Sequence, residues 1–206
     1  DKIAALCKKH GLLLIEDSAE TIGGMYDGKH AGSWGVAAWS FFPTKNITTG
    51  EGGMLTTNDD ATARMARKLI GHGIDKHAFE RQEASAPWKR VAVVPGYNFR
   101  MSNILAAIGV EQMKKIDQFN NRRRAHSATL ISFLEGIDGL ELPLPAKRCH
   151  HVYQMFTVKI PGRDRVSCVR YLRSRGIEAS VHFDPPVHLH PCYSDVATGD
   201  LGNTEN

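Results

Sequence analysis

The sequence places an acid, a hydroxyl and a lysine at the ends of two short apolar segments. Asp17 follows the apolar run of residues 12–15, and Ser40 lies near the end of a second run, residues 36–42. Lys45 comes shortly after the second run. A lysine that is removed from water holds its proton less firmly, and its neutral amine can form a Schiff base with an aldehyde. These residue types therefore allow carbonyl chemistry that begins at the lysine.

Each of these residues also has an ordinary structural interpretation. Taken alone, Asp17 could cap a helix or lie on the surface, and Ser40 could bond to local backbone groups. Lys45 could be a solvated loop charge, since lysine is costly to bury alone. Two features favour chemistry at Lys45. It follows a predicted strand that ends at Pro43, and it precedes the glycine-rich residues 50–53, whose backbone can approach a ligand closely.

The acid lies where a ligand site is expected. In open α/β sheets, ligands bind at the carboxyl ends of the strands, and Asp17 ends a predicted strand. A carboxylate there could pair with a cationic nitrogen, which the ring of pyridoxal phosphate (PLP) needs in order to withdraw electrons. Ser40 could donate its hydroxyl hydrogen to a phosphate near the lysine. Residues 50–53 could also cradle phosphate, although they lack the spacing of a nucleotide-binding loop.

Apolar periodicity predicts the elements that hold these residues. The continuous run 12–15 is typical of a strand buried on both faces of a parallel sheet, and residues 36–42 form a second apolar strand. A change of composition at residues 136–145 predicts a boundary between a large α/β domain, 1–135, and a small α+β domain, 136–206. Helices are predicted at residues 1–10, 59–70 (capped by Asp59 or Asp60), 102–116 (capped by Ser102), 117–135 and after Asp164. Strands are predicted at residues 54–57, 152–160 and 178–183. A turn is predicted at residues 26–29 and a long loop at residues 71–95.

Composition restricts the class of protein. The chain has 206 residues, of which 42% are hydrophobic and 23% charged, as is typical of a soluble globular fold. Its formal net charge of +4 is too small to indicate nucleic-acid binding, and no apolar run or signal peptide indicates a membrane. The four cysteines lack CxxC spacing, so a reducing, cytoplasmic location is expected. The chain lacks an initiator methionine and stops after a polar run, so we expect a longer protein, truncated here at both ends.

The sequence blocks that carry these residues resemble a known family. Residues 16–20 (EDSAE), 40–53 (SFFPTKNITTGEGG) and 96–102 (GYNFRMS) are similar, in order and spacing, to the DegT/DnrJ/EryC1/StrS sugar aminotransferases. The similarity extends to residues 180–183 and 188–191 and so covers nearly the whole chain. It implies a fold-type I PLP-transferase, of which this chain supplies part of the large mixed-sheet domain and an incomplete small C-terminal α+β domain.

The resemblance also implies a role for each site residue. Lys45 would form the Schiff base with PLP and shuttle protons, Asp17 would pair with the pyridine nitrogen, and Ser40 would contact the cofactor phosphate. Asn98 would reach the phosphate of the neighbouring subunit's cofactor, because active sites in this family form between the two subunits of a homodimer. Glu20 stands where Gln or His is common. It would lie near the cofactor ring, and it indicates a variation in substrate.

Two further candidates keep alternative interpretations. His182 could line the sugar site or be a strand histidine with a satisfied ring. Arg100 could meet an anionic group of the substrate or form a structural salt bridge. The histidines and cysteines of residues 149–192 could suggest zinc, but their spacings match no standard structural zinc site, and no metal is expected.

The implied reaction moves an amino group from an amino acid, with glutamate as the expected donor, to a keto sugar linked to a nucleotide, as in polysaccharide biosynthesis. A related sub-class dehydrates sugars and carries histidine in place of the lysine, so Lys45 argues against dehydration. Two alternatives stay open. One is a non-catalytic family member or fragment that binds a ligand or partner without turnover, and the other is a zinc-binding module.

Overall fold

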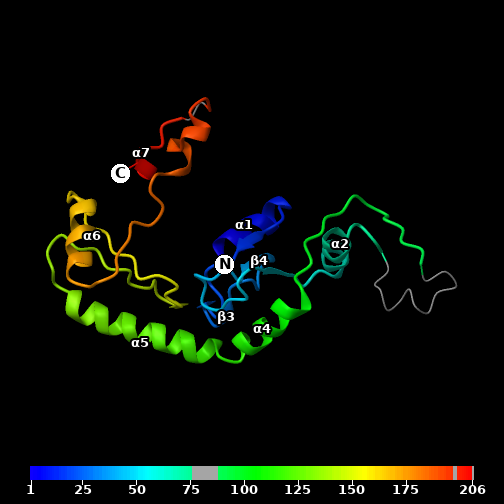
Figure 1. Cartoon of the computed structure of the whole chain (residues 1–206), viewed down its shortest axis with the longest axis horizontal. Coiled ribbons are helices and arrows are strands. Elements are labelled where there is room, and N and C mark those ends of the chain that lie inside the picture. The colour runs from blue at the N-terminus through cyan, green and yellow to red at the C-terminus, as the bar shows by residue number, and fades with distance from the viewer. Residues whose placement is uncertain (76–87, 197–198, 206) are drawn as a thin grey trace. The chain divides into compact units, whose positions relative to one another are not determined.

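The computed structural model describes residues 1–75, 88–196 and 199–205. The chain divides into two compact units, each described below by itself. The first combines Asp1–Phe133 with Leu144–Phe156, and the second combines Leu134–Pro143 with Thr157–Asn206 (Figure 1). The first unit thus contains every predicted site residue except His182, which lies in the second.

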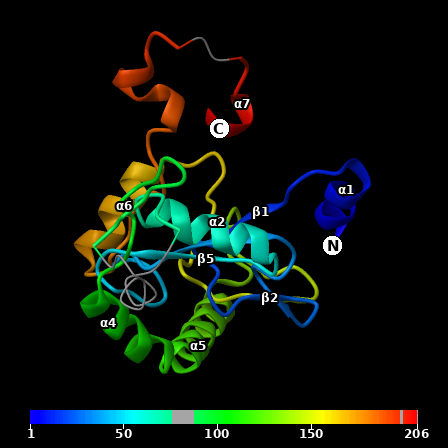
Figure 2. The same cartoon turned by 90° about the vertical axis from the view of Figure 1, so that its right-hand side faces the viewer.

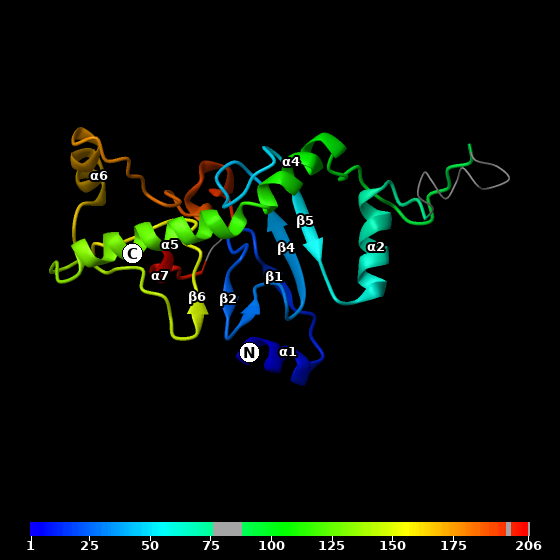
Figure 3. The ribbon, with the colours of Figure 1, turned by 90° about the horizontal axis from the view of Figure 1, so that it is seen from below.

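A three-stranded mixed sheet positions the predicted site in the first unit. Its central strand β4 (Val36–Ser40) pairs in parallel with β1 (Ile15–Asp17) and antiparallel with β5 (Gly53–Thr56), as Figure 3 shows. The predicted strands at 36–42 and 54–57 are confirmed within one or two residues. Because β1 and β4 run in the same direction, their carboxyl ends meet at one edge of the sheet.

The prediction that residues 12–15 form a strand buried on both faces is wrong. The strand begins only at Ile15, and the side chains of Leu13 and Ile15 are 90% and 72% exposed. Among the described residues β1 pairs only with β4, so it is an edge strand, and few side chains cover its faces. The apolar run correctly predicted a strand that pairs in parallel. It did not indicate which side chains would pack against the faces of that strand.

A second small sheet contains β2 (Met25–Tyr26), β3 (Lys29–His30) and β6 (Cys149–His150), in the order β3-β2-β6. The two residues between β2 and β3, Asp27 and Gly28, have φ of 52° and 73°, which is typical of a tight hairpin turn. The predicted turn at 26–29 is therefore confirmed. Arg148 donates to the Asp27 carboxylate, and this hydrogen bond lowers the pKa of Asp27.

The predicted helices of the first unit are present, and capping explains their bounds. The helix α1 (Lys2–His10) ends at Gly11, whose φ is 62°. Asp59 accepts a hydrogen bond from the Thr62 N–H at the start of α2, and Ser102 accepts one from the Leu105 N–H at the start of α4. The bounds are Asp60–Ile70 for α2, Asn103–Met113 for α4 and Ile116–Leu134 for α5. No helix of the described residues is long and apolar enough to cross a membrane.

The core of the first unit lies where β4 ends and α5 begins. Phe41, Ile47 and Ile116 are buried there, and Figure 2 shows α4 and α5 on the same side of the first sheet. Partly buried hydrophobic residues pack around this core: Ile22, Trp39, Met101 and Phe119. Since Phe41 and Ile47 stand on either side of Lys45 in the chain, the core fixes both ends of the lysine segment.

The second unit is built from helices and extended segments. It contains α6 (Arg165–Ser174), which begins after the predicted cap Asp164, the short 3-10 helices η1 (Val187–Leu189) and η2 (Pro191–Tyr193), and α7 (Gly202–Glu205). The predicted strands at 152–160 and 178–183 are wrong. Within the described part of this unit, ladder pairing is limited to one bridge between Glu141 and Lys159. Apolar alternation indicates an extended segment, but a strand also needs a neighbouring segment for its backbone hydrogen bonds.

Candidate active site

The segment that carries Lys45 is held by its backbone on both sides. The Lys45 N–H donates to the Phe42 carbonyl at 3.0 Å, and the Thr44 carbonyl accepts from the Gln154 side chain at 2.9 Å. Further along, the Thr49 N–H donates to the Phe41 carbonyl at 3.0 Å and closes the loop. The loop is therefore anchored at its base and leaves the Lys45 side chain as its projecting group.

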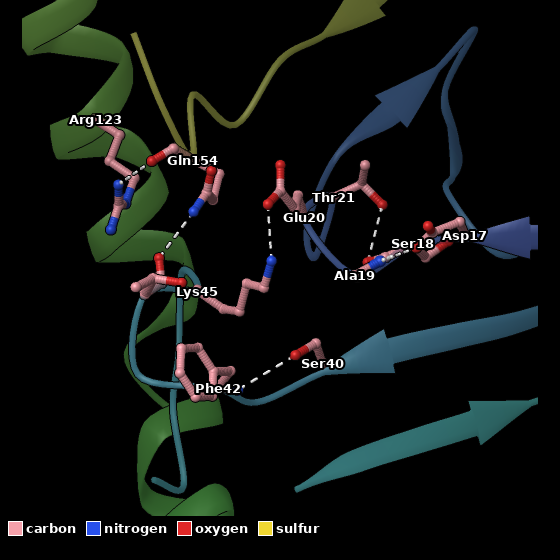
Figure 4. Close-up of polar contacts among 11 residues, drawn as sticks. Asp17, Ser18, Ala19, Glu20, Thr21, Ser40, Phe42, Lys45, Arg123 and Gln154 are labelled. Atoms are coloured by element: carbon pink, nitrogen blue, oxygen red, sulfur yellow. Dashed lines mark hydrogen bonds and ion pairs between the residues drawn. The ribbon is translucent and has the colours of Figure 1, made fainter. Parts of the chain in front are cut away.

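The Lys45 amine lies against a carboxylate. Lys45 Nζ is 2.7 Å from Glu20 Oε1, and Figure 4 shows the lysine side chain extending toward Glu20. The lysine side chain is 16% exposed and the glutamate side chain is 38% exposed, so the pair is partly removed from water. Such a charge-assisted hydrogen bond fixes the position of the amine more firmly than a solvated lysine would be fixed. Lys45 is therefore not a free loop charge.

Asp17 and Ser40 face the same side of the sheet. Asp17 is paired in register with Ala38 of the parallel neighbour β4, and Ser40 follows Ala38 by two residues along that strand. Paired residues share a face, and side chains two apart on a strand point the same way. The small side chain of Ala38 lies between them, and Gly53 is paired with Ser40 on the other side. The sheet thus presents an acid and a hydroxyl without bulky side chains between them.

Glu16 holds the strand that presents Asp17. Its carboxylate accepts hydrogen bonds from the backbone N–H groups of Gly32, Trp34 and Gly35, each at 2.8 Å. Because adjacent residues of a strand point to opposite faces, Glu16 is bonded on one side while Asp17 faces the other. This role of Glu16 was not predicted from the sequence. An acid beside the site acid on a strand is a recognisable signal, since the two must serve opposite faces.

The arrangement fits PLP by the chemistry of its groups. Asp17 Oδ1 accepts one hydrogen bond, from the Ala19 N–H at 3.1 Å, and Ser40 Oγ accepts one from the Phe42 N–H at 3.3 Å, so its own hydrogen is left to donate (Figure 4). A carboxylate, a hydroxyl donor and a lysine amine from adjacent chain segments match the groups that hold a pyridine nitrogen, a phosphate and an aldehyde.

Within the described part of the chain, no hydrogen bond, ion pair or ring contact joins Asn98, Arg100 or His182 to Lys45. Asn98 forms an isolated bridge with Gly71, and Asn98 and Arg100 are both exposed. His182 is exposed in the second unit, where its ring centroid lies 3.9 Å from that of Phe183. Their proposed roles stay predictions. Part of the predicted loop at 71–95, residues 76–87, lies outside the described residues.

The cysteines and histidines of the described residues are not arranged as a metal site. All four cysteines are free thiols. The described residues contain no group of three or more His, Cys, Asp or Glu side chains that could hold a metal ion.

Comparison with known proteins decides the family. The sequence matches the DegT/DnrJ/EryC1/StrS aminotransferase family over residues 1–206. The chain belongs to this family. It is 35% identical over 199 residues to the spore coat polysaccharide biosynthesis protein SpsC of Bacillus subtilis, and this match covers 94% of the chain and 51% of SpsC. The resemblance found in the sequence is thus confirmed.

Solved structures agree on the fold. The aminotransferase TlmJ from Streptoalloteichus hindustanus superposes with a TM-score of 0.85 at 31% identity, covering 98% of this chain and 53% of TlmJ. The sugar aminotransferase CalS13 from Micromonospora echinospora superposes with a TM-score of 0.80 at 29% identity, covering 93% of this chain and 50% of CalS13. The predicted fold class of PLP-dependent sugar aminotransferases is confirmed. The chain spans about half the length of the relatives it matches.

Proposed function

We propose that this chain carries the lysine-bearing part of a PLP-dependent sugar aminotransferase. The enzyme would transfer an amino group from an amino acid, with glutamate as the expected donor, to a nucleotide-linked keto sugar. The observation that supports this most strongly is the Lys45 amine, ion-paired with Glu20 next to the sheet face that presents Asp17 and Ser40. Family membership and similarity to sugar aminotransferases support the reaction class.

The roles of the residues follow from their chemistry. Bound PLP would supply an aldehyde that forms a Schiff base with Lys45 and a ring that withdraws electrons from the reacting carbon. Asp17, with its carboxylate at the strand end, would hold a proton on the ring nitrogen by charge pairing. Ser40 would donate its hydroxyl hydrogen to the phosphate. The freed Lys45 amine would take a proton from the donor's α-carbon, as a general base, and deliver it to the cofactor carbon that had carried the aldehyde, as a general acid.

Glu20 controls where the freed lysine can go. Because Glu20 Oε1 lies 2.7 Å from Lys45 Nζ, the carboxylate would hold the freed amine after it has taken up the proton from the donor. We further propose that the site is completed in a cytoplasmic homodimer, in which Asn98 of each subunit reaches the other subunit's cofactor phosphate. Arg100 and His182 would contact the substrate. The relative SpsC is named for polysaccharide biosynthesis, which supports a sugar substrate of that kind.

An absorbance titration with PLP tests the proposal. We expect a near-visible band in the wild-type chain that is absent in Lys45→Arg, since arginine cannot form the Schiff base. Lys29→Arg is the matched control, because Lys29 is exposed on β3, and its band should equal that of the wild type. A band of equal strength in Lys45→Arg, or no band in the folded wild type, would contradict the proposal.

Adding glutamate to the PLP-loaded protein separates the enzyme from a non-catalytic family member. Amino transfer consumes the band and produces 2-oxoglutarate, whereas a protein that only binds PLP keeps the band unchanged. The non-catalytic alternative is considered because the chain spans about half the length of its relatives.

A further inference from the structure

One buried amide joins the two chain segments that carry Lys45 and Glu20. Asn120, on α5, is 2% exposed. Its Oδ1 accepts a hydrogen bond from Asn46 Nδ2 at 2.6 Å, and its Nδ2 donates to the Ile22 carbonyl at 3.0 Å. Asn46 directly follows Lys45, and Ile22 comes two residues after Glu20. The Asn120 side chain therefore bridges the segments whose side chains meet in the ion pair.

The packing around Asn120 leaves little freedom for this bridge. Gly23, next to Ile22, has a φ of 81°, and a Cβ added to it would come within 2.4 Å of Asn120 Nδ2. A side chain at position 23 would therefore push the amide away from the Ile22 carbonyl. The close approach of backbone and amide here depends on glycine.

The orientation of the Asn46 side-chain amide is also fixed. Asn46 is 4% exposed, and its Nδ2 faces two acceptors, Asn120 Oδ1 at 2.6 Å and the Val152 carbonyl at 3.4 Å. Rotating the amide by half a turn would place its oxygen against both acceptors, so the assignment of its nitrogen is determined. Asn46 Oδ1 is buried and has no hydrogen-bond partner among the described residues.

A buried amide pair with an unsatisfied oxygen is a costly way to fill a core. Apolar side chains of similar shape would fill the same space at least as stably, because an unpaired buried acceptor carries a desolvation penalty. The pair therefore contributes something other than stability, and its contacts indicate what this is. It sets the separation of two backbone segments whose projecting groups must meet.

We propose that Asn120 is a positioning residue, which holds the segment after Lys45 at a fixed distance from the segment after Glu20 and so keeps the Lys45 amine against the Glu20 carboxylate. Asn120 acts through Asn46 and Ile22 and does not itself touch the reacting groups. The inference adds to the proposed role of Lys45, but its test uses the cofactor-free chain and does not depend on PLP.

Competitive acetylation tests this role. The cofactor-free full chain is treated with a trace of acetic anhydride, and mass spectrometry compares labelling of Lys45 with that of exposed Lys29. In the wild type, the ion pair should protect the Lys45 amine. Asn120→Leu should raise Lys45 labelling about tenfold relative to Lys29, because the amine loses its charged partner. Asn121→Leu on the same helix should leave it unchanged, because the Asn121 side chain bonds Arg124 and no other side chain among the described residues.

A double-mutant cycle separates positioning from general loosening. Glu20→Gln alone should also raise Lys45 labelling about tenfold, since it removes the charge. Added to Asn120→Leu, it should have no further effect, because the pair is already separated. Asn120→Asp keeps the acceptor for Asn46 and loses the donor to Ile22, so it should give an intermediate value and thus a partial rescue.

The proposal fails if Lys45 labelling is unchanged in folded Asn120→Leu, or if Glu20→Gln multiplies labelling by the same factor with and without Asn120→Leu. If Asn120→Leu alone does not fold, the double replacement Asn46→Leu with Asn120→Leu decides, since it leaves neither amide unpaired. It should fold and still show raised Lys45 labelling, and wild-type labelling in it would contradict the proposal. A failed PLP titration with intact coupling would instead reject the proposed function alone.

Discussion

The Lys45 loop and strand β1 both carry candidate site residues, yet they are held in different ways. The loop from Phe41 to Thr49 is fixed by the core, by its own backbone bonds and by α5. Strand β1 has one apolar side chain, Ile15, which is exposed, and the strand is fixed by pairing with β4 and by the Glu16 carboxylate. Apolar burial positions the lysine, whereas hydrogen bonds position the acid.

This difference has a consequence for how each half of the site responds to change. A packed segment is sensitive to lost volume, because a core cannot close fully around a cavity. A segment held by hydrogen bonds is sensitive to lost acceptors and tolerates changes in its exposed side chains.

Truncating the loop anchor should have the largest effect on stability. Ile47 is 2% exposed, and we expect Ile47→Ala to lower the free energy of unfolding by about 3 kcal/mol. The same truncation on β1, Ile15→Ala, should change it by no more than about 0.5 kcal/mol because Ile15 is exposed. Urea unfolding of both variants provides the measurement. Equal losses would remove the distinction between the two regions.

Removing the charge of the Glu16 carboxylate on β1 should lower the free energy of unfolding by a smaller amount. Glu16→Gln keeps the shape but removes the charge that three backbone N–H groups share, and we expect a loss of about 2 kcal/mol. Glu51→Gln is the matched control, because Glu51 is exposed beyond the lysine. If the two variants unfolded at the same urea concentration, the Glu16 hydrogen bonds would not be what fixes β1.

A pH dependence of stability should arise at His151, which precedes the buried residues Val152 and Tyr153. Burial lowers the pKa of His151 below its usual value of 6.5, and its Nδ1 accepts a hydrogen bond from the Tyr153 N–H at 3.0 Å. The folded state therefore binds this proton less readily than the unfolded state. The contribution of His151 to stability is fully present above the usual pKa and falls as the pH drops below it.

Comparison with His151→Gln isolates this contribution. As the pH falls from about 7.5 to about 5.5, the unfolding free energy of the wild type should decrease relative to that of the variant. A difference that stays constant over this range would show that His151 has no part in the pH dependence. The expected change is small because His151 is exposed, so its ring is only partly removed from water.

Local chemistry explains which parts of the fold could be predicted from the sequence. Helix starts at Asp59, Ser102 and Asp164 and the turn at Asp27 depend on neighbouring residues only, and these predictions are confirmed. Burial of β1 and the strands at 152–160 and 178–183 depend on partners distant in sequence. No local pattern shows whether such partners are present, so these predictions were wrong.

The same division applies to the candidate site. Asp17, Ser40 and Lys45 could be identified because residue type, strand ends and glycines all lie within short segments. The amide bridge of Asn46 and Asn120 could not, because it joins residues 74 positions apart, and an asparagine on a helix has no pattern that indicates its partner. Glu20 was recognised, but its contact with Lys45 required the fold.

Reduction of the PLP-treated chain tests the central claim most directly. Borohydride converts a Schiff base into a stable secondary amine, and peptide mass spectrometry then identifies the lysine that carries the cofactor. We predict that the phosphopyridoxyl group is found on Lys45, with the exposed Lys29 unlabelled at one equivalent of PLP. Labelling spread over exposed lysines, with Lys45 unmodified, would contradict the claim that this lysine is the site of the chemistry.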